Sequence, residues 1–202
     1  MTTYAGYDVL EVTDNRDKDP DQKYSRALVR LDAGYGKVAV FDKNGVTRTD
    51  KSFQWFMGDR SEIATFKAFV AARKGQAVPF WILTGQNDVQ MTLDALTTDS
   101  AITIKPIGYT KFLYGSNNGR RHLAFQFPDG TYVYRKITGA TDNVVSETLA
   151  LNSALGRAVP ASTIVSFLTL CRLSADDATM SWTTTTVGEA ILRFMEIPNE
   201  AP

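Results

Sequence analysis

The sequence predicts a mainly β protein, an antiparallel β-sandwich or barrel with one amphipathic α-helix at about residues 60–74. Two observations lead to this fold class. Roughly ten to a dozen short runs of alternating or β-branched residues are separated by turn residues, as in antiparallel sheets. Only one segment repeats its apolar residues at helical spacing. With 202 residues and no recognisable linker, the chain is expected to form a single β-rich domain over residues 1–202.

Four strands are expected before the helix. β-forming runs occupy residues 4–12, 27–31, 37–41 and 52–57. Residues 14–23 are polar throughout, so we expect a solvated loop there. Asn44-Gly45 follows the third run and favours a type I′ turn. The last of these strands leads directly into the helix.

The helix is indicated by its apolar stripe and by both of its ends. The stripe consists of Ile63, Phe66 and Val70, widened by Phe69 and Ala72, while Lys67, Arg73 and Lys74 are expected mainly on the polar side. Asp59 or Ser61 can cap the first turn, and Glu62 follows Asp59 at the spacing of a capping box. Gly75 then tolerates the left-handed conformation that ends many helices.

The pattern returns to strands after the helix. They are expected at residues 80–83, 90–93, 101–106, 109–114, 121–127, 131–137, 144–151, 163–173, 179–183 and 189–197. The clearest hairpin joins residues 121–127 to 131–137 through Pro128-Asp129-Gly130. The hairpin region within residues 101–160 could project from the domain as a lobe.

Large apolar side chains within these elements are expected to form the core. The residues predicted to pack there are Trp55, Ile63, Phe66, Val70, Phe80, Trp81 and Trp182. The three tryptophans could instead line a carbohydrate platform. Their apolar or β-forming neighbours favour core packing.

Catalytic and metal-binding chemistry finds little support in the residue types. His122 is the only histidine and Cys171 the only cysteine, which argues against a serine triad, a histidine-rich metal site and a disulfide framework. The alternating aspartates at residues 17–21 lack the glycine and glutamate that a calcium loop requires. We therefore expect no enzyme, with no catalytic, cofactor-binding or metal-binding residues and no cofactor.

The charge distribution points to contacts with other protein. Lys plus Arg and Asp plus Glu balance at 22 each, so the net charge favours neither nucleic acid nor an anionic membrane. Residues 101–160 carry seven basic against three acidic residues, and residues 161–202 carry two against five. In a ring of identical subunits, such opposite patches would favour head-to-tail contact. The predicted inter-subunit contact residues are Arg120, Arg121, Arg135 and Lys136.

Two other partner classes remain open at this stage. The basic residues within 101–160 alternate with tyrosines, and interleaved cations and aromatics on strands are typical of single-stranded nucleic-acid binders. A carbohydrate-binding β module would use exposed tryptophans. No segment approaches the roughly 20 apolar residues that span a bilayer, and the first residues lack the features of a secretory signal, so neither a membrane span nor secretion by that route is expected.

Two passages resemble a known family. Residues 52–55 and then 66–81 (FKAFVAARKGQAVPFW) are similar to the strand, helix and aromatic-x-x-Ala-Arg-x-Gly-x-x-x-x-Phe run of tail-tip proteins in tailed bacteriophages and gene-transfer agents. Residues 171–177 (CRLSADD), Ser181-Trp182 and residues 192–197 (LRFMEI) resemble the Arg-Leu-x-x-Asp, strand, aromatic-x-Glu-hydrophobic ending of the same group. Residues 84–89 and the long hairpin region match no family pattern, which leaves open a ring protein or an adjoining tail-tip subunit.

The resemblance implies a distal tail (Dit-like) or baseplate protein, which is a structural virion protein without catalytic residues. Such proteins are β-sandwiches or barrels with one helix, and they form a homo-oligomeric ring, usually a hexamer. The ring would connect the tail tube protein to hub or receptor-binding proteins. The expected location is the virion, in the phage tail, after synthesis in the bacterial host cytoplasm. Neither a membrane nor nucleic acid is an expected partner.

Overall fold

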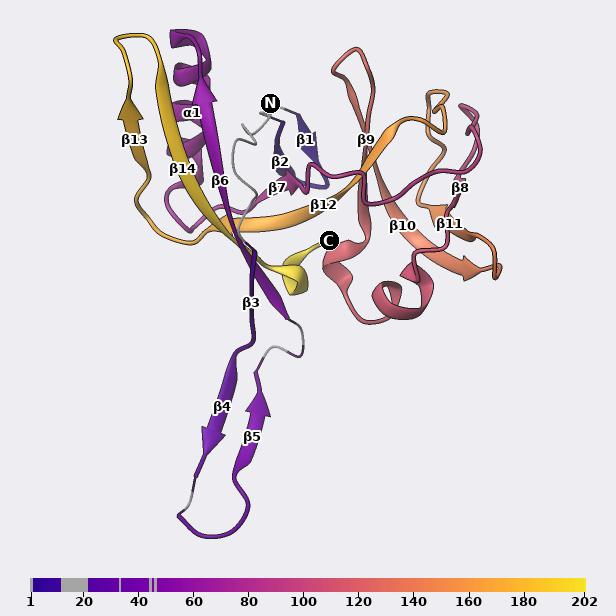
Figure 1. Ribbon diagram of the computed structural model, residues 1–202, viewed down its shortest axis with the longest axis horizontal. Helices are drawn as coiled ribbons and strands as arrows, with labels where there is room; N and C mark the ends of the chain where they lie inside the picture. Colours follow the sequence, from indigo (N-terminus) through magenta and orange to yellow (C-terminus); the bar gives the residue numbers. More distant parts are fainter. Residues whose placement is uncertain (1, 12–21, 33, 44, 46) are drawn as a thin grey trace. The chain divides into compact units, whose positions relative to one another are not determined.

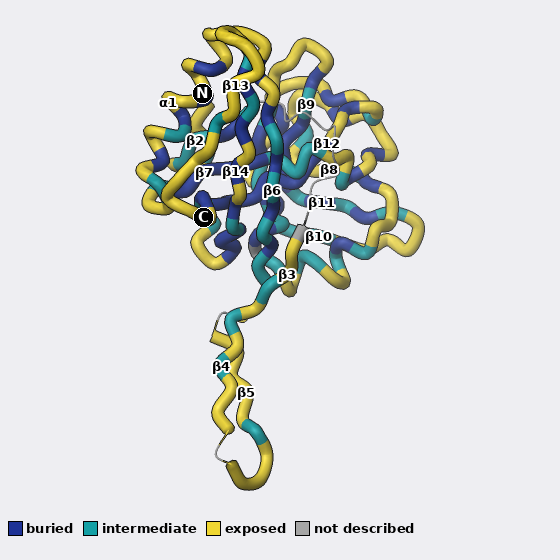
Figure 2. Tube along the Cα trace, turned by 60° about the vertical axis from the view of Figure 1, so that its left-hand side comes forward, coloured by how far each residue is buried: buried dark blue, intermediate teal, exposed yellow. Residues whose placement is uncertain are grey.

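A computed structural model describes residues 2–11, 22–32, 34–43, 45 and 47–202. The predicted fold class is confirmed: the protein is mainly β, with 44% strand, 13% helical residues and only one sizeable helix among the described residues. Figure 1 shows the path of the chain, and Figure 2 shows which parts of it are buried. The predicted loop at residues 14–23 and the Asn44-Gly45 turn fall wholly or partly outside the described residues.

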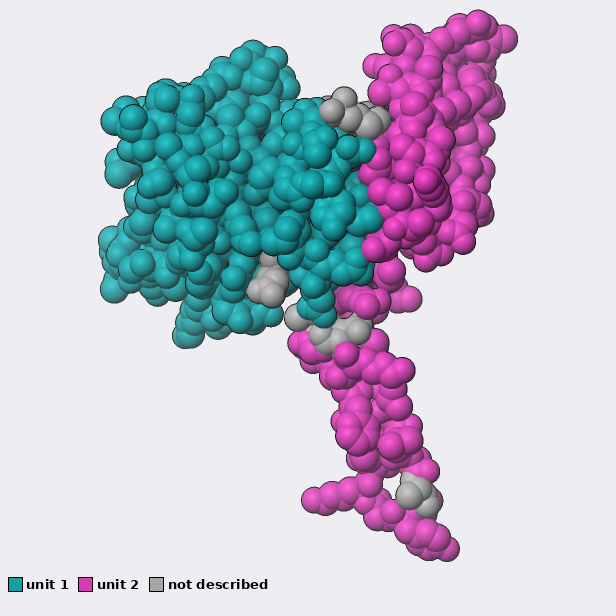
Figure 3. Space-filling view, turned by 180° about the vertical axis from the view of Figure 1, so that it is seen from behind, with its two compact units in different colours: residues 1–13, 79–171, 197–202 teal, residues 14–78, 172–196 magenta. Residues whose placement is uncertain are grey.

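The chain forms two compact units, each built from separate stretches of sequence. Unit 1 comprises residues 1–13, 79–171 and 197–202, and unit 2 comprises residues 14–78 and 172–196 (Figure 3). Each unit is therefore assembled from stretches that are far apart in the sequence, and no linker composition in the sequence indicates where one unit ends and the other begins. The turn residues at 174–177 lie within unit 2, where composition alone does not distinguish them from an ordinary loop.

Unit 1 contains a curled sheet of eight strands. In spatial order these are β1 (Thr3–Tyr4), β2 (Tyr7–Leu10), β7 (Phe80–Leu83), β12 (Ile164–Leu173), β9 (His122–Gln126), β10 (Tyr132–Asp142), β11 (Glu147–Leu151) and β8 (Ala101–Ile104). The last two residues of β12 belong to unit 2. Neighbouring strands are antiparallel except β2 and β7, which are parallel. The predicted hairpin is formed by β9 and β10, with Gln126 opposite Tyr132.

Both faces of the unit 1 sheet are covered by apolar side chains. On one face, Leu123 and Phe125 belong to a cluster with Ile137 and Val165. On the other face, Ala124 packs in a cluster with Trp81 and Tyr134. The strand therefore alternates between two cores, which explains why β9 is buried throughout most of its length.

Two predicted strands of unit 1 are wrong. Residues 110–114 form a short π-helix, η1 (Thr110–Tyr114), and residues 90–93 make only an isolated bridge between Met91 and Ile104. Short 3₁₀ helices follow at η2 (Asn118–Arg120) and η3 (Pro198–Glu200). Residues 101–160 contribute their strands to the main sheet of unit 1 and form no two-stranded sheet of their own.

Among the described residues, unit 2 contains the helix, four antiparallel strands that pair in one sheet, and a separate two-stranded hairpin described below. The strands are β3 (Gln22–Ser25), β6 (Arg48–Met57), β14 (Gly188–Glu196) and β13 (Thr179–Trp182), and the helix is α1 (Arg60–Arg73). The longest pairing joins β6 to β14, with Gln54 opposite Ile191. The side chains of β6 and β14 that alternate inward include Trp55 and Phe194, whose rings lie 5.5 Å apart.

The helix begins and packs largely as its sequence predicts. Asp59 accepts hydrogen bonds from the backbone N–H groups of Ser61 and Glu62, and Lys74 adopts the left-handed conformation at the C-terminus. Ile63, Phe66 and Phe69 are buried, and Phe66 contacts Trp55 with ring centroids 5.7 Å apart, whereas Val70 is half-buried. The prediction that Arg73 lies toward the polar side is wrong. Its side chain is buried, with the guanidinium 4.8 Å from the centre of the Phe69 ring.

Candidate assembly surface

A separate hairpin in unit 2 exposes apolar side chains on both of its faces. β4 (Leu28–Leu31) and β5 (Ala39–Asp42) pair with each other in a two-stranded sheet of their own. Because successive strand residues point to opposite faces, the pairs Val29–Phe41 and Arg30–Val40 place apolar groups on each face. The exposed fractions are 55% for Leu28, 58% for Leu31, 58% for Val40 and 54% for Phe41. Figure 2 shows both strands coloured mainly as exposed.

The base of this hairpin is fixed by polar contacts. Arg26 Nε donates to Thr47 Oγ1 at 3.0 Å, Arg26 Nη1 lies 3.4 Å from Asp42 Oδ2, and Lys43 N donates to Ala27 O at 2.9 Å. An exposed ion pair of this kind contributes little to stability. A two-stranded hairpin without a covered apolar face is marginally stable in water. Cover from a partner surface would stabilise β4 and β5 and remove their apolar side chains from solvent.

The two passages that resemble tail-tip proteins meet within unit 2. The strand of the first passage, β6, pairs with β14 of the second. Beyond the helix, Arg172 Nη1 donates to the carbonyl oxygens of Gln76 (3.0 Å) and Ala77. Asp176 Oδ1 accepts a hydrogen bond from Gln76 N at 3.0 Å. The Arg and Asp of the second passage thus bind the backbone that follows the Ala-Arg-x-Gly run of the first.

Glycine is strongly favoured at position 75 by this contact. Gly75 has φ +64°, and a Cβ placed on it would lie 2.4 Å from Asp176 Oδ1. Only a residue without a side chain both adopts this backbone conformation readily and admits the carboxylate. The spacing between Arg73 and Gly75 in the first passage therefore has a structural reason that sequence analysis did not identify.

The four predicted contact cations are engaged with backbone carbonyls inside unit 1. Arg135 donates from Nε and Nη2 to Ala154 O, from Nη2 to Leu155 O and from Nη1 to Tyr134 O, at 2.6–2.9 Å. Lys136 Nζ donates to Pro202 O at 2.7 Å. These bonds fix the loop at residues 154–155 and the segment at residue 202. A contact of Arg135 or Lys136 with another subunit stays a prediction.

Arg120 and Arg121 are half-buried beside η1 and η2. Arg121 Nη2 donates to Tyr114 O at 3.0 Å, and its guanidinium lies 4.7 Å from the centre of the Tyr114 ring. The backbone carbonyl of Arg120 accepts from the hydroxyl of the buried Tyr109 at 2.8 Å. Of the tyrosines interleaved with these cations, Tyr109 and Tyr134 are buried, so their rings are not available to stack on nucleic-acid bases.

The tryptophans do not form a common platform. Trp55 and Trp81 are buried in unit 2 and unit 1 respectively, as are Phe80, Ile63 and Phe66 among the predicted core residues. Trp182 is 52% exposed at the end of β13, which corrects the prediction that it packs in the core. Its indole lies 5.0 Å from Lys67 Nζ on the helix, so a cation–π contact holds it at the edge of unit 2.

His122 is buried where three separate stretches of unit 1 meet. Its Nε2 lies 3.1 Å from the carbonyl oxygen of Pro202, which can only accept, so Nε2 carries the proton. Nδ1 then accepts from the hydroxyl of Tyr4 at 3.0 Å. Burial is the main cause that lowers the pKa of His122 to about 4, and the positive charges of Lys136 and Arg121 act in the same direction. The hydrogen bond with Pro202 acts in the opposite direction but is outweighed. The single histidine is thus a neutral structural residue at ordinary pH.

Groups of metal ligands and helices that could span a membrane are not found in the described part of the chain. It contains no group of three or more His, Cys, Asp or Glu side chains placed to hold a metal ion. None of its helices combines the length and apolar character that a membrane span requires. Cys171 is buried and is not part of a disulfide.

Comparison with known proteins gives no identification. A scan against protein-family models found no matching family, and a search of curated proteins found no significant match.

Proposed function

We propose that this chain is a structural subunit of a bacteriophage tail tip or baseplate, and that it forms a homo-oligomeric ring connecting the tail tube to hub or receptor-binding proteins. The single observation that carries this proposal is the β4–β5 hairpin, whose apolar side chains are exposed on both faces. A surface of this kind is explained by a partner that covers it. The partner is a neighbouring copy of the same chain.

One further observation supports the class of protein. Arg172 and Asp176, in the second passage that resembles tail-tip proteins, bind the backbone of residues 76–77 and so help to hold unit 2 together. Residues that maintain a shape are what an assembly protein requires. The function then lies in surfaces that meet neighbours, with hexamer as the expected ring size by resemblance.

The test is the oligomeric state of the purified chain, measured by native mass spectrometry and negative-stain imaging. A double substitution, Val40→Ser with Phe41→Ser, removes one apolar group from each face of the hairpin. Full burial of such a side chain contributes about 1.5–3 kcal/mol, and roughly half of each is exposed, so the pair contributes about 1.5–3 kcal/mol per contact. The dissociation constant between subunits should therefore rise about 10- to 100-fold.

The matched control is Leu96→Ser, which removes an apolar side chain that is 65% exposed in unit 1. This control should leave assembly unchanged. A wild-type chain that stays monomeric at high micromolar concentration would refute self-assembly. Assembly that is equally insensitive to the hairpin double variant and to Leu96→Ser would remove the hairpin from the proposal.

A further inference from the structure

The turn between β10 and β11 exposes two adjacent valines in an unfavourable backbone conformation. Val144 is 88% and Val145 is 80% exposed, and Val144 has φ +72°. A β-branched residue at positive φ is a genuine outlier, whereas glycine would adopt this conformation without strain. The turn is fixed by bonds from Asn143 N to Ser146 O (2.8 Å) and from Val144 N to Asp142 Oδ1 (2.9 Å). Strain and apolar exposure therefore coincide at a well-defined tip.

A buried carboxylate places a second apolar and basic segment next to this turn. Glu147 begins β11 and accepts from the backbone N–H groups of Ile107 (2.8 Å) and Thr110 (2.6 Å). Ile107 and Phe112 on this segment are exposed, and Lys105 and Lys111 flank them. We call the set of Lys105, Ile107, Lys111, Phe112, Val144 and Val145 the basic tip.

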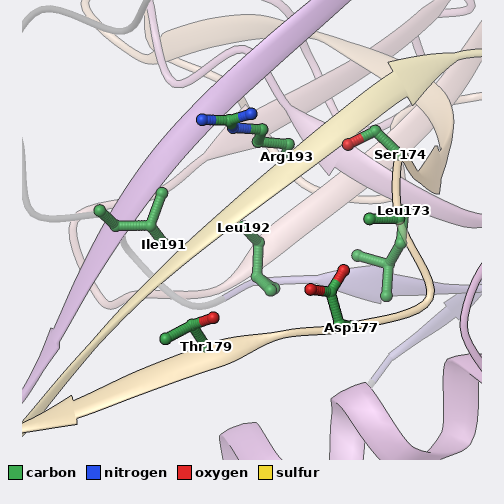
Figure 4. Close-up of a pocket in the computed structure, with 8 residues that line it drawn as sticks. Leu173, Ser174, Asp177, Thr179, Ile191, Leu192 and Arg193 are labelled. Carbon is green, nitrogen blue, oxygen red and sulfur yellow. The ribbon is translucent and has the colours of Figure 1, made fainter.

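Unit 2 carries a hollow whose size suits a small number of side chains. Its volume is about 280 Å³, and its lining residues are Leu173, Ser174, Ala175, Asp177, Thr179, Ile191, Leu192 and Arg193. Figure 4 shows Leu192 and Asp177 pointing into the space between β13 and β14. Pockets for drug-sized ligands span roughly 300–1,000 Å³, so this hollow lies at the lower limit of that range. The buried Leu173 and Leu192 supply its apolar surface, and Asp177 lies at its exposed edge.

The hollow follows from how β12 connects to β13. Ser174 N donates to Arg193 O, and Thr179 pairs with Ile191. The segment from Ser174 to Thr179 therefore advances five residues while β14 advances only two, from Ile191 to Arg193. The extra residues bow away from β14. Asp176 holds this bowed loop in place through its hydrogen bond with Gln76 N. The hollow is therefore preformed.

We propose that the basic tip of one subunit inserts Val144 and Val145 into the hollow of the next subunit. Lys105 and Lys111 of the tip then face Asp177 of the hollow, and the carboxylate of Asp142 beside Val144 faces Arg193. This inference rests on the proposed ring, and it supplies a contact between two different patches of the chain. Contacts of that type generate rings or filaments, because each subunit offers one patch and uses the other.

A second copy fits the basic tip better than a lipid surface does. Few exposed apolar side chains are available at the tip, and even a full acyl chain gives only marginal membrane binding. The hollow combines apolar lining with one carboxylate, Asp177, and one guanidinium, Arg193. The turn combines the apolar valines with the exposed carboxylate of Asp142, and Lys105 and Lys111 lie on the neighbouring segment, so groups of opposite charge are present on both surfaces. Both surfaces are present on the same chain, so no other component is required.

Cysteine cross-linking tests the contact directly. Val145→Cys and Thr179→Cys would be made as single variants, mixed, and treated with a short bis-maleimide; the native Cys171 is buried. The mixture should give covalent dimers at least tenfold more abundant than a mixture of Val145→Cys with Ser61→Cys, since Ser61 lies at the opposite end of α1 from the loop near Gly75. The double Val145→Cys, Thr179→Cys variant should give a ladder up to the full ring.

A second variant separates the contact from folding. Val144→Gly removes the strain and an apolar group, so the urea midpoint should stay equal or rise while the subunit dissociation constant rises at least tenfold. A ring that forms without cross-linking above the Ser61→Cys control would overturn the contact and leave the ring intact. Cross-linking only within one chain of the double variant would do the same. Binding of wild-type but not Val144→Gly protein to vesicles with anionic lipid would assign the tip to a membrane instead. Absence of any ring would instead refute the proposed function.

Discussion

Replacing Gly75 with alanine tests the link between the two family-like passages. The new Cβ would lie 2.4 Å from Asp176 Oδ1, 3.0 Å from its Cγ and 3.2 Å from its Cα. The carboxylate would have to swing away and give up its bond with Gln76 N. The backbone φ of +64° adds a second penalty for any residue with a side chain.

The expected loss follows from these two effects. Holding alanine in the left-handed region costs about 1–2 kcal/mol. A hydrogen bond to a charged group contributes about 1.5–3 kcal/mol when it is buried away from water. Because Gln76 and Asp176 are both exposed, we assign about 1 kcal/mol to the bond between them. Gly75→Ala should therefore lower the free energy of unfolding by about 2–3 kcal/mol.

The assay is urea denaturation followed by far-UV circular dichroism and tryptophan fluorescence, with the slope m checked for constancy. Gly130→Ala is the matched control, because Gly130 has φ +79° but no atom within 4 Å of an added Cβ. Gly130→Ala should lower the free energy of unfolding only by the cost of the left-handed backbone, about 1–2 kcal/mol. A double-mutant cycle with Asp176→Ala should give a coupling of about 1 kcal/mol, since the alanine at 75 no longer meets the carboxylate. Equal losses for Gly75→Ala and Gly130→Ala, or strict additivity in the cycle, would refute the reasoning.

Two further predictions concern pH and the helix. Because the pKa of His122 is about 4 in the folded protein and near 6.5 when unfolded, the unfolded chain binds more protons between these values. The free energy of unfolding should therefore fall by about 3 kcal/mol as pH drops from 6.5 to 4, and His122→Gln should flatten this part of the pH profile; an unchanged slope would contradict the assignment. Phe66→Ala should cost about 3–5 kcal/mol in urea denaturation, against less than about 0.5 for the exposed Thr65→Ala, and a loss under 1 kcal/mol would show that α1 is not packed as described.

Local signals in the sequence were sufficient where neighbouring residues determine the structure. The helix has its cap, stripe and stop within about 16 consecutive residues, and α1 ends within one residue of the predicted boundary. The hairpin of β9 and β10 has alternating strands and a short turn, and both strands form with the expected partner. Such features depend on few long-range contacts, so periodicity and turn residues were enough to predict them.

Long-range contacts explain the errors. Residues 110–114 read as a strand, but Glu147 lies 37 positions away and binds the backbone and hydroxyl of Thr110, which starts η1. Its four hydrogen bonds outweigh the effect of burial and hold the pKa of Glu147 below its usual value. Arg73 looks polar in sequence, yet Phe69 on the same helix gives its guanidinium an aromatic surface. A pattern of residue types carries no information on a partner so far along the chain.

The candidate surface was the least predictable part for the same reason. Arg135 and Lys136 read as free cations, but their acceptors are backbone carbonyls, which every residue possesses and no sequence pattern marks. The strands of the β4–β5 hairpin were predicted, whereas their exposure was not, because exposure depends on which elements fail to cover a strand. A positive φ at Val144 is also invisible in the sequence, since valine usually excludes it.

In the proposed assembly, stability and contact between subunits depend on different residues. Gly75, Arg172 and Asp176 fix unit 2 through contacts that favour the folded state, and their spacing accounts for the family-like passages. Val144 and Phe41 do the opposite, because each exposes apolar surface and Val144 adds backbone strain. Substitutions at Gly75, Arg172 or Asp176 should unfold unit 2 before they affect assembly. Substitutions at Val144 or Phe41 should weaken assembly while the monomer stays as stable or becomes more stable.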